Sequence, residues 1–571
     1  MFQRIFPIAA ALSLSACAIP THAEMIDRGV ATGPVASGMV SAADPRAAAA
    51  GVDMLRQGGT AADAAFATLL ALNVVEPQSS GIGGGGYLVY SDKGGAPVTF
   101  DGREIAPHAA TGTWFYKNGQ PMEFSDAQPG GKSVGVPGNL RMMAMAHARY
   151  GKLPWAAIFQ PAIRLARDGF KISPRFYGAL AGNKRTGALS AQGREIFYQA
   201  DGNPKPAGTL VKNPAFADFL EGIAKSGAEA FYAAPNAQNI VATVNQAPVN
   251  PSQMTEADVA SYKVVQRPPV CGTYRGYRIC GMAPSSSGGL AVFETLKQLE
   301  RFDLTALGPN SPTAWHLIAE SMRLAYADRE LYLGDPGYVS VPVAGLMDPA
   351  YLAKRSALIS MDRAIPSVTA GHPAGAPKMV CTTGPVQERG TSHFVAVDSE
   401  GNVASETSTI EDIFGSGLMV SGYYLNNELT DFNIIPDKDG CLTANRVQGG
   451  KRPRSSMSPT IVYDRQGRVR LAVGAAGGPT IPAQVLKAII GVIDWHYSAQ
   501  QAIALPVIFA PGDTVYLEKG TFIESMTPQL QAMGHTVQTR PPGFKANAVE
   551  WVDGHWAGGA DPRSEGAAVS Q

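Results

Sequence analysis

The residues best suited to chemistry lie in the segment ERGTSHFVAVD, where Thr391 follows Gly390 and begins a predicted strand. A threonine hydroxyl is a weak nucleophile and needs a base. The simplest local base is the threonine's own α-amine, which becomes available only if the chain is cut between these two residues. A free α-amine has a pKa of about 7.7–8.0, so it can accept the hydroxyl proton at neutral pH. Without further information, an ordinary β-forming threonine remains the simpler interpretation.

Other segments match active-site patterns but lack the structure that those patterns require. The glycines of residues 81–86 fit G-x-G-x-x-G, yet a strand at Tyr87–Tyr90 follows where a dinucleotide site needs a helix. Gly131–Gly135 fits the nucleophile pattern G-x-S-x-G, but a loop precedes it instead of a strand. The nine histidines are scattered without metal-binding spacing. We therefore expect no metal or cofactor, and we interpret residues 81–86 as a turn with close backbone approach.

Helices and strands are distributed unevenly along the chain. Apolar spacing, caps and Gly or Pro stops predict helices at 44–57, 60–72, 139–150, 155–169, 289–302 and 313–332. Alternating polar and apolar residues predict hairpins around 400–402 and 466–467. Helices thus dominate the first two thirds and antiparallel strands the last third. This segregation favours stacked sheets with outer helices over an alternating β/α fold.

The composition describes a neutral, globular chain. Its 571 residues include 47 Lys+Arg and 47 Asp+Glu, which argues against a nucleic-acid-binding protein. Hydrophobic residues make up 45% of the chain, so it is not a disordered tail. The 63 glycines and 42 prolines indicate many tight turns. The length alone suggests two to four domains of about 150 residues.

The first 23 residues are typical of a secretory signal peptide. A positive charge at Arg4 precedes a mostly apolar stretch at 5–19, which is too short to span a bilayer. Small residues at Thr21 and Ala23 fit an ordinary cleavage before Glu24. Leu14–Cys17 instead resembles a lipobox, which would leave a lipidated cysteine on an outer-membrane-anchored lipoprotein. Both interpretations predict export to the periplasm or beyond, and no later stretch is a candidate membrane span.

Export permits disulfides, and four further cysteines are available: Cys271, Cys280, Cys381 and Cys441. The first two flank a predicted two-residue turn at Arg275-Gly276. Counting outward by alternation places them opposite each other in a non-hydrogen-bonded pair, where Cα atoms approach to about 4.5 Å. That distance allows a disulfide, although two free thiols remain an alternative. The sequence indicates no partner for the other two cysteines.

A set of motifs in order gives the chain a specific resemblance. It resembles the γ-glutamyltranspeptidases (glutathione hydrolase proenzymes) of the N-terminal-nucleophile hydrolase superfamily from about residue 28 to 570. Each motif is weak by itself, but their number and order are specific. They are SSGIGGGGYLVY, DGREIAP, GVPGNL, ESMRLAYADRELYLGDP, TSHFVAVDSEGN, LNNELTDF, KRPRSSMSPTIV, GAAGGPTI and ADPRSEGAA.

The resemblance implies an α+β fold, a four-layer αββα sandwich made as one precursor. It implies self-cleavage at the Gly390–Thr391 bond, with the threonine hydroxyl attacking the glycine carbonyl to give an ester that water opens. The large chain would be residues 24–390 and the small chain residues 391–571. The two chains would form one intertwined domain over residues 24–571, in place of the two to four domains that length alone suggests.

The resemblance also implies roles for particular side chains. Arg103 matches the arginine that binds the α-carboxylate of a γ-glutamyl group, a role that suits a guanidinium fork. Ser455 and Ser456 match the serine pair that donates to the same carboxylate. Asp431 matches the acceptor of the α-ammonium, and Glu411 adds a negative charge where some relatives carry Asn. Asn427 and Glu428 receive no assigned contact.

The catalytic groups follow from the same comparison of motifs. Gly477 and Gly478 match the glycine pair whose backbone N–H groups form the oxyanion hole, where the backbone must approach the oxygen closely. Thr409 matches the threonine that orients the nucleophile. His393 is interpreted as structural. Residues 432–454 contain no tyrosine, whereas many relatives carry one there in a longer lid, so we expect a short lid and an open site.

These observations predict an exported γ-glutamyltransferase and glutathione hydrolase. A Thr391 γ-glutamyl ester would pass the group from glutathione or another γ-glutamyl compound to water, an amino acid or a peptide. An acylase of the same fold, acting on glutaryl side chains of β-lactams, is one alternative. A non-catalytic γ-glutamyl-binding envelope lipoprotein, suggested by Cys17, is another. The favoured acceptor and the ratio of hydrolysis to transfer do not follow from the sequence.

Overall fold

The strand that begins one residue after Thr391 lies inside a seven-stranded sheet, called sheet 1. The computed structural model describes residues 38–93, 95–384 and 390–571. The proposed signal peptide and Cys17 lie outside these described residues. The strands of sheet 1 are, in spatial order, β24 (Ala567–Ser570), β1 (Met39–Ala42), β11 (Ser392–Val397), β12 (Val403–Thr409), β2 (Gly85–Ser91), β3 (Val98–Asp101) and β8 (Val265–Arg267).

A second sheet of six strands, sheet 2, contains most of the remaining long strands. In spatial order these are β23 (His555–Ala560), β22 (Lys545–Val552), β18 (Val469–Ala476), β17 (Thr460–Tyr463), β10 (Tyr277–Gly281) and β9 (Val270–Tyr274). Side chains alternate across each strand, so Val395 and Val397 of β11 face sheet 2 and form a buried cluster with Ile461 and Ala472. The two sheets therefore share a buried apolar cluster.

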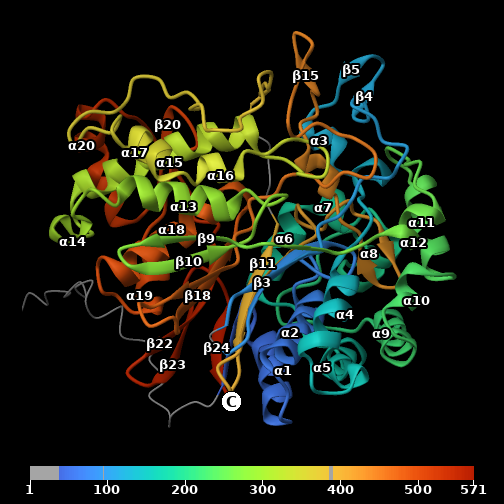
Figure 1. Ribbon diagram of the computed structural model, residues 1–571. Helices are drawn as coiled ribbons and strands as arrows, with labels where there is room; N and C mark the ends of the chain where they lie inside the picture. The colour runs from blue at the N-terminus through green and yellow to red at the C-terminus, as the bar shows by residue number, and fades with distance from the viewer. Residues whose placement is uncertain (1–37, 94, 385–389) are drawn as a thin grey trace, which may run out of the picture. The chain divides into compact units, whose positions relative to one another are not determined.

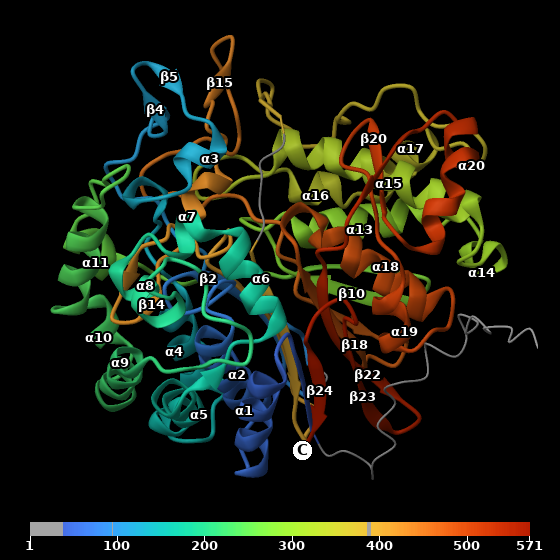
Figure 2. The ribbon, with the colours of Figure 1, turned by 180° about the vertical axis from the view of Figure 1, so that it is seen from behind.

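Helices cover the outer face of each sheet, and Figures 1 and 2 show them on opposite sides of the strands. The even-numbered β11 residues Phe394 and Ala396 belong to the core under the first helical layer. That layer includes α1 (Pro45–Arg56), α2 (Ala61–Val75), α4 (Asn139–Tyr150) and α5 (Trp155–Asp168). The layer over sheet 2 includes α13 (Gly288–Leu299), α15 (Pro312–Tyr332) and α18 (Ile481–Ile493). The predicted αββα sandwich is confirmed.

The order of the strands corrects the prediction that helices dominate the first two thirds of the chain and strands the last third. Sheet 1 takes β1, β2, β3 and β8 from the first half of the chain, so helices and strands are less segregated along the sequence than predicted. The further helices are α3 (Phe124–Ala127), α6 (Pro174–Gly182), α7 (Lys184–Gly187), α8 (Ala191–Phe197), α9 (Pro214–Ser226), α10 (Glu229–Tyr232), α11 (Asn236–Asn245), α12 (Glu256–Ser261), α14 (Leu304–Leu307), α16 (Val343–Leu346), α17 (Pro349–Ser356), α19 (Ala499–Ala504) and α20 (Thr527–Ala532). The further strands are β4 (Tyr116–Lys117), β5 (Gln120–Pro121), β6 (Phe170–Lys171), β7 (Leu210–Val211), β13 (Met419–Val420), β14 (Tyr423–Tyr424), β15 (Asp437–Lys438), β16 (Cys441–Leu442), β19 (Ile508–Phe509), β20 (Thr514–Glu518) and β21 (Thr536–Arg540).

Local sequence explains how the first layer begins. Asp44 caps α1, and Thr60 and Asp63 form a reciprocal capping box at the start of α2. The glycine turn after α2 then allows very close backbone packing. A Cβ on Gly84 would lie 2.0 Å from the carbonyl oxygen of Thr409, which no side chain can occupy. Glycine at this position therefore allows the turn to pack directly against the backbone of Thr409, at the end of β12.

Two disulfides are present among the described residues. Cys271 and Cys280 face each other across the β9–β10 hairpin with a Cα–Cα distance of 4.2 Å, in the register expected from the Arg275-Gly276 turn. Cys381 is bonded to Cys441 at a Cα–Cα distance of 5.8 Å, a pair that the sequence did not indicate.

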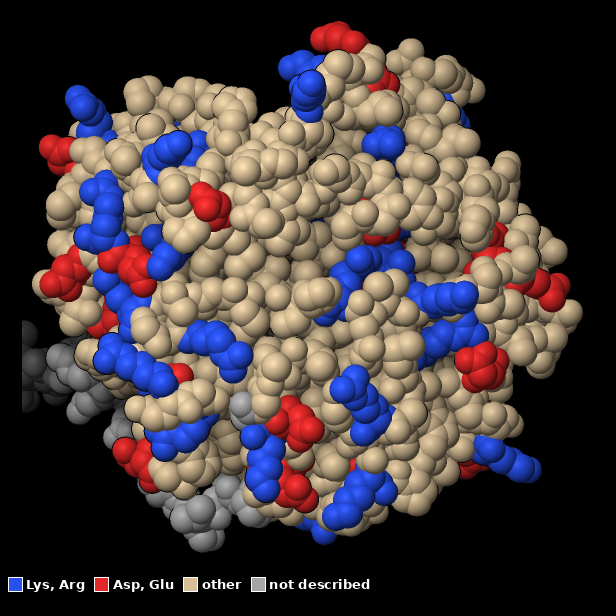
Figure 3. Space-filling model, in the orientation of Figure 1, with Lys and Arg blue, Asp and Glu red and all other residues tan. Residues whose placement is uncertain are grey.

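The distribution of charge on the surface agrees with the neutral composition of the chain. On the face drawn in Figure 3, acidic and basic side chains are interspersed, and uncharged residues cover much of the surface between them. None of the described helices combines the length and the apolar character that a membrane crossing requires.

Candidate active site

The bond between Gly390 and Thr391 is intact in this structure and lies at the start of β11. The Thr391 hydroxyl is directed at the carbonyl oxygen of Gly390, and the Thr409 hydroxyl donates to the same oxygen at 2.7 Å. The Thr409 oxygen in turn accepts the backbone N–H of Glu411 at 2.7 Å. The structure therefore places two hydroxyls at one buried carbonyl. Thr409 contacts this carbonyl, whereas the sequence predicted that it would orient the nucleophile.

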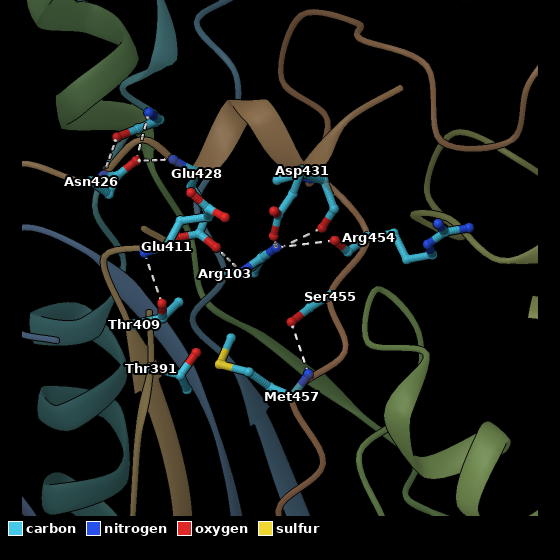
Figure 4. A network of polar contacts seen from close by, with 12 residues as sticks. Arg103, Thr391, Thr409, Glu411, Asn426, Glu428, Asp431, Arg454, Ser455 and Met457 are labelled. Atoms are coloured by element: carbon cyan, nitrogen blue, oxygen red, sulfur yellow. Dashed lines mark hydrogen bonds and ion pairs between the residues drawn. The ribbon is translucent and has the colours of Figure 1, made fainter. Parts of the chain in front are cut away.

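Arg103 lies beside these threonines at the centre of a charged cluster (Figure 4). Its guanidinium donates to the carboxylates of Glu428 and Asp431, and also to the carbonyl oxygens of Pro453 and Arg454 at 3.2 and 3.0 Å. Burial lowers the pKa of Arg103, but the two carboxylates outweigh burial and raise that pKa well above its usual value. The arginine is therefore held as a buried cation.

Glu411 contributes a third carboxyl group to the cluster. Asn427 donates its side-chain amide to one carboxyl oxygen of Glu411, while the other carboxyl oxygen is buried and has no hydrogen-bond partner among the described residues. Burial is the main cause that raises the pKa of Glu411 well above its usual value, and Asp431 and Glu428 raise it further. These surroundings therefore favour the protonated form of Glu411. A cation that binds beside Glu411 would favour the carboxylate and lower its pKa.

Ser455 completes the wall opposite Thr391. Its hydroxyl accepts the backbone N–H of Met457 at 3.1 Å, which leaves the hydroxyl hydrogen free to donate into the site. The cavity enclosed by these groups is about 10 Å³, which is room for about one water molecule. Its lining residues are Arg103, Gly390, Thr391, Thr409, Glu411, Glu428, Asp431, Ser455 and Met457.

Three predicted site residues do not line this cavity. Ser456 is buried outside the lining of this cavity, and its hydroxyl accepts from the guanidinium of Arg329 at 2.6 Å. Gly477 and Gly478 follow β18 of the facing sheet, and Gly477 borders a separate pocket of about 270 Å³. In β18, the preceding Ala476 pairs with Lys545, so the glycine pair still follows directly on a strand that packs against β11.

A buried ion pair lies beside Ser392, the residue after Thr391. The Lys545 ammonium contacts Glu76 at 2.9 Å and the hydroxyl of Ser392 at 3.1 Å. Burial lowers the pKa of Lys545, and Glu76 opposes that effect. His393, which the sequence predicted to be structural, is buried between the sheets and bonds Thr407 at 2.8 Å. Burial lowers its pKa to about 3, so it remains a neutral part of the core.

Sequence reasoning missed the contact of Glu428 with Arg103. The available signal in the sequence was the spacing of three residues between Glu428 and Asp431. In the structure these residues lie in a 3-10 turn, where residues three apart are on one side and can flank one cation. In the part of the chain that the structure describes, no cluster of three His, Cys, Asp or Glu side chains is arranged to hold a metal ion. The charged cluster instead has the components to bind a group that carries both charges.

Comparisons with known proteins agree with this geometry. A family model described as gamma-glutamyltranspeptidase matches residues 47–571. The chain is 36% identical over 545 residues to the glutathione hydrolase proenzyme of Bacillus subtilis (strain 168), covering 93% of this chain and 91% of that one. It is 35% identical over 545 residues to the acylase ACY 1 proenzyme of Pseudomonas sp. (strain SE83), covering 93% of each chain.

The fold has a close counterpart among solved structures. The crystal structure of a cephalosporin acylase from Bacillus halodurans superposes with a TM-score of 0.83 at 26% sequence identity, covering 98% of this chain and 99% of that one. The match to the family model and the superposition on the acylase both extend across the bond between Gly390 and Thr391. The likeness therefore includes the residues on each side of this bond.

Proposed function

This chain belongs to the γ-glutamyltranspeptidase family, and we propose that it is a γ-glutamyltransferase and glutathione hydrolase with Thr391 as nucleophile. One observation carries the proposal. The hydroxyls of Thr391 and Thr409 meet at the Gly390 carbonyl, beside an Arg103 that is flanked by carboxylates. The first feature suits self-cleavage, and the second suits an α-amino acid group as substrate.

Self-cleavage proceeds by acyl transfer within the chain. The Thr391 oxygen attacks the carbonyl carbon of Gly390, a C–O bond forms, the C–N bond breaks, and the nitrogen takes the proton. The Thr409 hydroxyl, already 2.7 Å from the carbonyl oxygen, stabilises the negative charge that develops there. Water then opens the ester, leaving a carboxylate on Gly390 and both an amine and a hydroxyl on Thr391.

The charged cluster then binds the γ-glutamyl group. A substrate α-carboxylate takes one side of the Arg103 guanidinium and the hydroxyl of Ser455. The α-ammonium beside it takes the carboxylates of Asp431 and Glu428. Because the substrate carries one charge of each sign, it enters the buried ion pairs without leaving a charge unpaired, which would otherwise cost about 3–5 kcal/mol.

Glu411 adapts to the same substrate. Its raised pKa favours the neutral form in the empty site, and a nearby ammonium favours the carboxylate. Binding of a γ-glutamyl compound therefore releases a proton from Glu411 at pH values below its pKa.

Turnover repeats the acyl transfer on the bound substrate. The freed α-amine of Thr391 accepts the hydroxyl proton, the hydroxyl attacks the γ-amide, and the leaving amine departs with that proton. Backbone N–H groups of Gly477 and Gly478 hold the tetrahedral oxygen in this cycle. The γ-glutamyl ester passes to water, an amino acid or a peptide. In the uncut chain the cavity is too small for this group, so we expect the precursor to be inactive.

Denaturing gels and a chromogenic substrate test the proposal. Wild type separates into two chains under reducing conditions and releases nitroaniline from a γ-glutamyl anilide, whereas Thr391→Ala stays full length and is inactive. A wild type that remains a single full-length band under reducing conditions would refute the self-cleaving mechanism.

An acylase acting on glutaryl side chains is the second candidate, favoured by the likeness to the two acylases. A glutaryl group lacks the α-ammonium, so it would leave the carboxylates of Asp431 and Glu428 without a cationic partner from the substrate. We therefore expect a higher kcat/KM for a γ-glutamyl anilide than for the matched glutaryl anilide. The opposite order would assign the chain to the acylases.

Processing and location belong to the same proposal. Residues 1–23 direct export, and the mature enzyme consists of residues 24–390 and 391–571. A cut at the lipobox would instead make a lipidated Cys17 the first residue of the large chain and hold the enzyme at the outer membrane. The two disulfides support an oxidising compartment. Sheet 1 supports one intertwined domain, because strands from both sides of Gly390 alternate in it. N-terminal sequencing of the mature chains would identify both cleavage points together.

A further inference from the structure

The disulfide between Cys381 and Cys441 spans the proposed cleavage point. The first cysteine lies nine residues before Gly390, and the second lies in β16, downstream of Thr391. The bond therefore joins the two chains that self-cleavage would produce. The other disulfide differs in this respect, since Cys271 and Cys280 both belong to the large chain.

Further contacts hold the same large-chain segment against the small chain. Cys381 forms a parallel bridge with Thr443. The side chain of Asn433 donates to the hydroxyl of Thr383 at 3.2 Å and to the carbonyl of Gly384 at 3.3 Å. The disulfide thus closes a docked segment and is not an isolated link between two surface loops.

The small-chain partner is the β15–β16 hairpin within residues 432–454, which projects from the body of the protein in Figure 1. The ends of this segment lead directly into the charged cluster. Asn445 donates to the carbonyl of Asp431 at 2.7 Å and accepts the backbone N–H of Arg454 at 2.8 Å. The Lys451 ammonium bonds the carbonyls of Ala444 and Arg446 within the same segment. The large chain is thereby attached to the segment between two groups of substrate-binding residues.

We infer that the mature enzyme remains one covalent molecule after self-cleavage, with Cys381 of the large chain bonded to Cys441 of the small chain. This inference rests on the proposed cleavage at Gly390–Thr391. The bond retains the new carboxyl end of the large chain at the hairpin, and it makes unfolding a process within one molecule. Two chains held only by packing would instead separate on unfolding, so their stability would depend on protein concentration.

Paired gels test the link directly. Wild type purified without reductant and treated with iodoacetamide should run as one full-size band without reductant and as two chains with it. Cys441→Ser should give two chains in both lanes. The matched control is Cys271→Ser with Cys280→Ser, which removes the disulfide inside the large chain and should behave as wild type. Two separate wild-type chains without reductant would overturn the inference.

Failure of the cleavage is distinguishable from failure of the link. A single wild-type band in both lanes would refute cleavage, and with it the two-chain enzyme on which the inference depends. Peptide mapping would then report whether the Cys381–Cys441 bond exists in the uncut chain.

Thermal unfolding provides an independent readout. For cut Cys381→Ser/Cys441→Ser enzyme, a hundredfold dilution should lower the midpoint by about 2 °C, because the chains separate on unfolding. The wild-type midpoint should not move. Equal concentration dependence in both proteins would contradict a covalent link.

Discussion

Thr409 offers a sharp test, because its hydroxyl donates to the carbonyl oxygen of the bond that we propose is cut. Thr409→Val keeps the shape and the β-branched side chain but removes the 2.7 Å hydrogen bond to the Gly390 carbonyl. It also removes the acceptor for the backbone N–H of Glu411. Removing one oxyanion donor costs about 2.7–4 kcal/mol in the transition state, or about 10²–10³ in rate. We therefore expect self-cleavage to slow by that factor.

The assay is a time course of the full-length band on reducing gels, starting from freshly made precursor. Thr409→Ser keeps the hydroxyl and should cleave within about tenfold of wild type. Thr407→Val is the matched control on the same face of β12, since Thr407 bonds His393 and not Gly390. If Thr409→Val cleaves as fast as wild type, the hydroxyl does not stabilise the developing charge and the proposed role is wrong.

Three further predictions concern the charged cluster and the glycine turn. Arg103→Lys should lower kcat/KM for a γ-glutamyl anilide by about 10- to 150-fold, mainly through KM, because a single ammonium replaces a fork of charge-assisted hydrogen bonds; an unchanged KM would contradict carboxylate binding at Arg103. The raised pKa of Glu411 means that kcat/KM should fall as the pH drops below that pKa, since the protonated form no longer attracts the substrate ammonium; protonation of the Thr391 α-amine adds an acidic limb of its own, so Glu411→Gln should keep that limb and lose only the Glu411 contribution, and an identical pH profile in both enzymes would count against the role. Gly84→Ala should destabilise the protein by about 1–3 kcal/mol and slow cleavage, because the new Cβ would overlap the Thr409 carbonyl oxygen; a thermal midpoint and cleavage rate equal to those of wild type would show that the turn can relax.

Much of the local structure could be predicted from neighbouring residues. The capping box at Thr60 and Asp63 depends on a spacing of three residues, and the facing of Cys271 and Cys280 depends only on the turn between them. The exact ends were less predictable: the second helix continues to Val75 because its whole surface is buried, which overrides the local stop signals.

The site was predictable in its members and less so in its geometry. Motif resemblance selected Arg103, Asp431 and Thr391, which the structure does bring together in one cavity. It also selected Ser456, whose hydroxyl the structure directs to Arg329. Two adjacent serines are equivalent in a motif, and only the packing around them decides which one faces the cluster.

The sequence by itself indicated the Thr391 segment through its motifs, the strand alternation, and the facing of the two hairpin cysteines, because each depends on residues close together in the chain. Only the tertiary structure decided the contacts between distant segments. It placed Glu428 on Arg103, directed Thr409 to the carbonyl of Gly390, and bonded Cys381 to Cys441 across the proposed cleavage point. These contacts arise where two sheets and their loops pack together, and no local spacing specifies which of the many distant partners will meet.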